Sequence, residues 1–95
     1  MFCLDGKKVL ITGASGGIGG QIARTLHAAG ATVALSGTRI GPLQSLSNEL
    51  GTMAHVLRCD LSDFDEVTAL PKQAVEVMGG VDILINNAGV TRDNL

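Results

Sequence analysis

Four short apolar runs alternate with three longer segments in which apolar residues recur every three or four positions. The apolar runs lie at residues 8–12, 32–36, 54–59 and 81–86. The periodic segments lie at residues 17–29, 42–51 and 62–78. Short apolar runs are typical of buried strands, and the longer periodic segments are typical of helices. Because strands and helices that alternate in this way build βαβ units, the chain is expected to adopt an α/β fold with a parallel sheet.

Right-handed crossovers between successive strands predict the strand order 3-2-1-4. This order is the N-terminal half of a Rossmann-type doubly wound sheet, together with the first strand of its other half. The fourth strand, at residues 81–86, is then an edge strand. It is almost entirely apolar, so we expect both of its faces to be covered and its edge to be paired by a further part of a larger domain.

Individual residues predict where the second and third helices begin and end. Pro42 is expected at the first position of the second helix, where no N–H donor is needed, and Gly51 is expected to end that helix. Ser62 is expected to be the N-cap of the third helix, with acidic residues in the first turn. Pro71 cannot donate to the carbonyl of Val67, so a kink is expected there.

A glycine-rich segment joins the first strand to the first helix. Residues 12–19 read Thr-Gly-Ala-Ser-Gly-Gly-Ile-Gly. Gly13 is expected to allow the tight turn, Gly17 a close approach of phosphates, and Gly19 the packing of the helix on the strand. The positive end of the helix dipole faces the same place, so the segment predicts a pyrophosphate-binding turn. The alternative is that these glycines serve turn geometry only.

Composition and charge narrow the function classes. Seven basic and nine acidic residues give a net charge of −2 without a basic cluster, which argues against a nucleic-acid partner. No apolar stretch has the length of a signal peptide or a membrane span, so a cytoplasmic location is expected. Cys3 and Cys59 are expected to be free thiols. His27 and His55 lack companions at metal-ligand spacing, so no metal site is predicted.

The glycine segment at 12–19 and the sequence Asn-Asn-Ala-Gly at 86–89 together resemble the short-chain dehydrogenase/reductase family. The resemblance implies a nicotinamide dinucleotide bound at the turn, with Asn87 to Gly89 beside the ribose and Asp60 with Leu61 against the adenine. For Asp60 alone, a carboxylate at a helix start is an equal alternative. The expected cofactor-binding residues are Gly13, Ser15, Gly16, Gly17, Ile18, Gly19, Thr38, Arg39, Asp60, Leu61, Asn87, Ala88 and Gly89.

The end of the second strand bears on which dinucleotide is bound. An acidic residue there would hydrogen-bond the ribose 2′-hydroxyl and repel a 2′-phosphate, but the chain carries Thr38 and Arg39 instead. Because a guanidinium suits a phosphate, NADP is expected rather than NAD. The alternative is that Arg39 is a solvated loop residue. In addition, Gly16 stands where many NADP-using relatives carry a basic residue.

The run at 86–95, Asn-Asn-Ala-Gly-Val-Thr-Arg-Asp-Asn-Leu, is similar to that of the 3-oxoacyl-acyl-carrier-protein reductases of fatty-acid synthesis. That resemblance implies hydride transfer from NADPH to the 3-keto group of acyl chains on acyl carrier protein, and a homotetramer. Such reductases use a Tyr, a Lys, a Ser and an Asn at positions that the resemblance places beyond Leu95, and this chain contains no Tyr. Residues 1–95 are therefore expected to be the N-terminal dinucleotide-binding part of one Rossmann domain, without its catalytic half.

The sequence is compatible with two alternatives to a 3-oxoacyl-acyl-carrier-protein reductase. One is a short-chain reductase that acts on a sugar, a steroid or a small ketone. The other is a non-catalytic nucleotide-binding fragment. A Tyr-x-x-x-Lys pair in a companion segment would separate the enzymes from the non-catalytic alternative.

Overall fold

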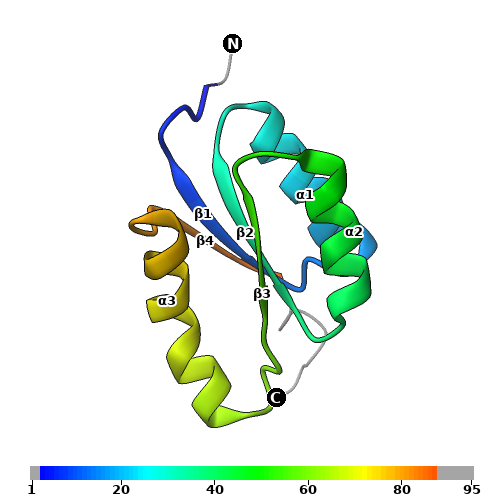
Figure 1. Cartoon of the computed structure of the whole chain (residues 1–95), viewed down its shortest axis with the longest axis vertical. Helices are drawn as coiled ribbons and strands as arrows, with labels where there is room; N and C mark the ends of the chain where they lie inside the picture. The colour runs from blue at the N-terminus through cyan, green and yellow to red at the C-terminus, as the bar shows by residue number, and fades with distance from the viewer. Residues whose placement is uncertain (1–2, 88–95) are drawn as a thin grey trace.

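Four parallel strands form one sheet, with helices on both of its faces (Figure 1). The computed structural model describes residues 3–87. The strands are β1 (Lys8–Thr12), β2 (Thr32–Gly37), β3 (Ala54–Arg58) and β4 (Ile83–Asn86). The helices are α1 (Gly17–Ala28), α2 (Ile40–Leu50) and α3 (Phe64–Met78). Strands and helices alternate along the chain, as the apolar pattern predicted.

The strands lie in the order β3-β2-β1-β4, which confirms the predicted order. In the parallel register, Val9 is opposite Val33 on one side of β1 and opposite Ile83 on the other. The direction of strand addition reverses after β3, because α3 carries the chain back across the sheet to β4. Right-handed crossovers then put α1 and α2 on one face and α3 on the other, as Figure 1 shows.

Two apolar clusters, one on each face of the sheet, hold the helices in place. The larger lies under α1 and α2 and includes Ile11, Leu35 and Leu43, all fully buried. The smaller lies under α3 and joins Leu10 of β1 to Leu70 of that helix. Successive residues of β1 therefore point into different clusters, which is why buried strands read as continuous apolar runs. The clusters fix the helices relative to the carboxyl ends of the strands.

The starts of α2 and α3 differ from the positions expected from the sequence. The α2 helix begins at Ile40, so Pro42 lies at its third position, where an N–H still has no partner within the helix. The N-cap of α3 is Asp63 and not Ser62: its carboxylate accepts from the N–H groups of Asp65 and Glu66 at 3.0 and 3.2 Å. Ser62 is instead engaged with the preceding loop. The α3 helix continues through Pro71 to Met78.

The β4 strand is shorter and less covered than expected. It begins at Ile83, because Asp82 is used to bond the start of β1: its N–H donates to the Lys8 carbonyl, and its carboxylate accepts from the Lys8 N–H. Ile83 and Ile85 pack against the larger cluster, whereas Leu84 on the other face is 59% exposed. Within residues 3–87, one face of β4 therefore lacks the expected cover, because α3 packs mainly on β2 and β3.

Candidate functional site

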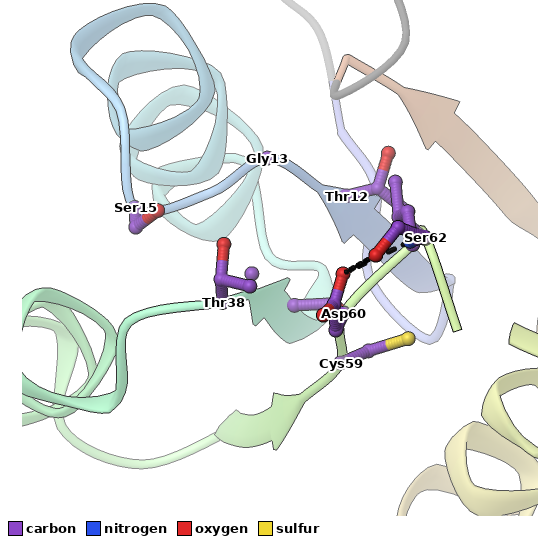
Figure 2. Close-up of a pocket in the computed structure, with 10 residues that line it drawn as sticks. Thr12, Gly13, Ser15, Thr38, Cys59, Asp60 and Ser62 are labelled. Carbon is purple, nitrogen blue, oxygen red and sulfur yellow. Dashed lines mark hydrogen bonds between the residues drawn. The ribbon is translucent and has the colours of Figure 1, made fainter. Parts of the chain in front are cut away.

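A cavity of about 220 Å³ opens at the carboxyl ends of β1, β2 and β3. The loops that follow these strands supply its walls, and Figure 2 shows the Thr38, Asp60 and Ser62 side chains among them. Its lining residues are Thr12, Gly13, Ser15, Ser36, Gly37, Thr38, Cys59, Asp60, Leu61 and Ser62. Ligands of open α/β sheets bind at this edge, beside the point where the strand order reverses.

The glycine turn brings α1 against the end of β1. Gly13 adopts a φ of 67°, in the left-handed region that favours glycine, and the N–H of Ala14 donates to the Ser36 carbonyl at 2.9 Å. A Cβ on Gly19 would collide with the Gly13 carbonyl oxygen and lie 2.9 Å from the Ala14 Cα. The roles expected for Gly13 and Gly19 therefore match the observed geometry.

The start of α1 is suited to an anion. Gly16 is its N-cap and offers no side-chain oxygen to the first turn, and that turn contains no acidic residue. The first N–H groups of the helix and its dipole are therefore available to a phosphate. A Cβ on Gly17 would meet no atom within 4 Å, and the Ile18 side chain is 73% exposed. This open, uncapped helix start fits the pyrophosphate of a dinucleotide.

Asp60 borders the cavity after β3 as a fixed carboxylate. Its Oδ1 accepts from the Ser62 hydroxyl at 2.7 Å and from the Ser62 N–H at 2.9 Å, shown as dashed lines in Figure 2. These two hydrogen bonds lower the pKa of Asp60 below its ordinary value. Since Asp63 caps α3, Asp60 is not the carboxylate of the helix start. Leu61, the next residue, is partly exposed at the cavity wall.

The β2–α2 loop forms another part of the rim. Thr38 lines the cavity, and Arg39 is the exposed N-cap residue of α2. A Cβ on Gly37 would lie 3.0 Å from the Ser15 hydroxyl oxygen, so the glycine lets this loop lie close to the glycine turn. The structure therefore brings Thr38 and Ser15, from separate loops, to one cavity.

The floor of the cavity contains two buried residues that the sequence analysis did not single out as ligands. Ser36 is 1% exposed, and its hydroxyl has no hydrogen-bond partner among residues 3–87. Such a hydroxyl fits a polar ligand group, because buried polar atoms are normally paired. Burial, together with the nearby Glu66 and Asp60 carboxylates, raises the pKa of the Cys59 thiol, so this cysteine is an uncharged part of the wall. Ser36 and Cys59 both lie at the carboxyl ends of strands, and this position in the sequence was the signal that could have marked them as cavity residues.

The end of β4 is tied to the glycine turn. The Thr12 hydroxyl donates to the Asn86 side-chain oxygen at 3.1 Å, and the Asn87 side-chain amide donates to the Gly13 carbonyl at 3.2 Å. Asn87 therefore lies beside the turn and supports it. The other two residues of the expected ribose contact, Ala88 and Gly89, lie outside the described residues.

Across residues 3–87, no group of three or more His, Cys, Asp or Glu side chains could hold a metal ion. None of the three helices described above has the length and apolar character needed to cross a membrane. Cys3 and Cys59 are both free thiols, as expected.

Comparison with known proteins decides the family. The family model described as short chain dehydrogenase matches residues 7–95. The chain belongs to this family. Short-chain dehydrogenases are oxidoreductases that use a nicotinamide dinucleotide, and the uncapped α1 start and the open space at Gly17 fit that cofactor.

Two curated relatives align with the whole chain. Nodulation protein G from Rhizobium sp. (strain N33) is 55% identical over 95 residues, which are 39% of its own length. A 3-oxoacyl-[acyl-carrier-protein] reductase from Rickettsia bellii is 43% identical over 95 residues, 38% of its length. This short-chain dehydrogenase chain thus spans about two fifths of the length of these relatives.

A solved structure shows the same fold. The 3-ketoacyl-(acyl-carrier-protein) reductase from Brucella melitensis, complexed with NADH, superposes with a TM-score of 0.82 at 33% identity. The match covers 85% of this chain and 33% of the Brucella chain. The Rossmann-type architecture of this chain therefore agrees with its membership in the short-chain dehydrogenase family.

Proposed function

We propose that this chain is the N-terminal, NADP-binding part of a cytoplasmic 3-oxoacyl-acyl-carrier-protein reductase. The whole enzyme would reduce the 3-keto group of acyl chains held on acyl carrier protein, and the bound NADPH would supply the hydride. Its catalytic Tyr, Lys and Ser would come from a further segment of the same Rossmann domain, and the enzyme would assemble as a homotetramer. The relatives from Rickettsia and Brucella, which carry this activity in their names, support the proposal.

In this proposal, each loop at the cavity would hold a different part of the cofactor. The turn from Gly13 to Gly19 and the uncapped start of α1 would hold the pyrophosphate, with Ser15 as a hydroxyl donor. The adenine would lie against Asp60 and Leu61, whose loop is fixed by the hydrogen bonds to Ser62. Asn87, with Ala88 and Gly89, would lie beside the ribose.

The proposal specifies NADP rather than NAD as the bound dinucleotide. At the end of β2, the observation that favours it is the exposed Arg39 beside Thr38, where an NAD-binding site would place a carboxylate. Gly16 adds no second cation in the turn, and the Brucella relative was solved with NADH. The test is equilibrium binding of NADPH and NADH to the full-length protein. We expect NADPH to bind at least tenfold more tightly, and a ratio near one would refute the preference.

The carbonyl substrate is tested separately. Oxidation of NADPH by the full-length protein should be fastest, as kcat/KM, with acetoacetyl groups carried on acyl carrier protein. A comparison set of acetoacetyl-CoA, a steroid ketone and a small cyclic ketone covers the other class of substrate. The second candidate, a reductase of another carbonyl compound, is favoured by the Rhizobium relative, whose name states no fatty-acid role. Preference for a free ketone would establish that candidate instead.

A further inference from the structure

Arg58, the last residue of β3, connects the two loops that border the adenosine side of the cavity. Its Nε donates to the Thr38 carbonyl oxygen in the β2–α2 loop at 3.1 Å. One of its terminal nitrogens, Nη1, lies 3.5 Å from a carboxylate oxygen of Glu66 on α3. The guanidinium is planar and presents donors in fixed directions, so one side chain can serve both partners at once.

Glu66 extends the connection to the β3–α3 loop. The same carboxylate oxygen, Oε1, accepts from the backbone N–H of Asp60 at 2.9 Å. A continuous chain of contacts therefore runs from Thr38 through Arg58 and Glu66 to Asp60. The first residue of this chain of contacts lies in the β2–α2 loop and the last in the β3–α3 loop. Both of these end residues, Thr38 and Asp60, line the cavity.

The Arg58–Glu66 pair is placed to orient the β2–α2 and β3–α3 loops more than to stabilise the fold. The Arg58 and Glu66 side chains are 49% and 38% exposed, and ion pairs this open to solvent contribute little to folding. Their bonds, however, end on backbone groups. Because the peptide group is planar and trans, a fixed Thr38 carbonyl also fixes the direction of the Arg39 N–H and the path of the chain into Arg39.

The loop has few other side-chain restraints at this point. Arg39 caps α2 without a side-chain hydrogen bond, and Gly41 follows two residues later in the first turn of that helix. Among residues 3–87, the bond from Arg58 is the one side-chain hydrogen bond to the Thr38 backbone. Without it, the path of the chain from Thr38, which lines the cavity, into Arg39 would be less restricted.

We propose that Arg58 is a positioning residue for cofactor selection, which holds the Thr38–Arg39 loop in the geometry that receives the adenosine 2′-phosphate. Glu66 orients Arg58 and joins this loop to Asp60. The inference rests on the proposed NADP site. It adds that selectivity depends on a residue of β3 whose guanidinium is directed at the backbone of the loop.

The experiment measures dissociation constants for NADPH and NADH with the full-length protein and its variants. Arg58→Gln should weaken NADPH binding about three- to tenfold, the range expected from loss of one hydrogen bond of ordinary net strength, and NADH binding less than twofold. Arg58→Lys should show nearly the same loss, because an ammonium keeps the charge but lacks the two-directional fork. Glu66→Gln should lower the NADPH-to-NADH preference to a smaller extent.

Arg24→Gln is the matched control. Arg24 is also half exposed and pairs with Glu49 at 2.6 Å, joining α1 to α2, and its two side-chain hydrogen bonds within residues 3–87 both go to Glu49. Its removal should leave the ratio of the two dissociation constants unchanged. The melting temperature of each variant separates a change of selectivity from a loss of folded protein, and Glu66→Gln provides the test if Arg58→Gln does not fold.

Each outcome bears on one of the two proposals. If wild-type protein discriminates between NADPH and NADH, and Arg58→Gln leaves that ratio unchanged, the role of Arg58 is overturned and the proposed function stands. If Arg58→Lys retains the full wild-type ratio, the charge acts on the phosphate directly and the positioning role is overturned. If wild-type protein binds neither dinucleotide, the proposed function fails, and this inference fails with it.

Discussion

At the scale of the residue, two glycines of one turn should respond differently to the same added methyl group. Gly19→Ala places a Cβ against the Gly13 carbonyl, and Gly17→Ala places one in open space. We expect Gly19→Ala to lower the free energy of unfolding by about 1–3 kcal/mol, measured in urea. Gly17→Ala should leave it unchanged or slightly raised, and should weaken NADPH binding. Equal losses of stability in both variants would contradict this account.

The Asp60 carboxylate makes a pH-dependent prediction. Hydrogen bonds from Ser62 lower its pKa in the folded state, so ionised Asp60 stabilises the fold above the ordinary range of an aspartate. That contribution is lost as the pH falls through the lowered pKa. Ser62→Ala should raise the pKa of Asp60 towards its ordinary value, which carboxyl NMR titration measures directly. A pKa that did not move would show that the Ser62 hydroxyl does not hold the carboxylate in solution.

At the scale of the element, the start of α3 separates two adjacent residues with similar capping propensity. Asp63→Ala removes the acceptor of two helix N–H groups and should cost about 0.5–2 kcal/mol of stability in urea unfolding. Ser62→Ala should cost less, because Ser62 bonds the Asp60 carboxylate and not the helix. If Ser62→Ala were the more damaging change, the N-cap assignment would be wrong.

The same helix start shows how far the sequence could predict these elements. Apolar periodicity located the four strands and three helices of residues 3–87, because burial against a two-sided sheet leaves a direct trace in the sequence. It could not choose between Ser62 and Asp63 as the N-cap, since both residue types cap helices and the choice depends on where Asp60 lies.

The contact of Arg58 was missed in the sequence for a similar reason. Its partner is a backbone carbonyl 20 positions earlier, and no residue pattern marks that contact.

At the scale of the whole molecule, the face around β4 sets how the 95-residue chain behaves on its own. A mostly apolar groove of about 180 Å³, with Leu10, Leu70 and Leu84 in its lining, lies beside this strand. The strand order also places β4 at an edge of the sheet. Unpaired edges and exposed apolar surface favour association between copies. The 95-residue chain should therefore self-associate at micromolar concentrations, as measured by analytical ultracentrifugation.

Leu84→Lys tests whether this face is responsible. A charge at the edge strand opposes pairing between sheets, so the variant should shift the chain towards monomer. Val77→Lys is the control, because Val77 is a partly exposed apolar residue on α3 that does not line the groove. Equal dispersal by both variants would mean that added net charge, rather than the β4 face, governs association. A wild-type chain that stays monomeric and melts sharply would show that residues 1–95 cover this face themselves.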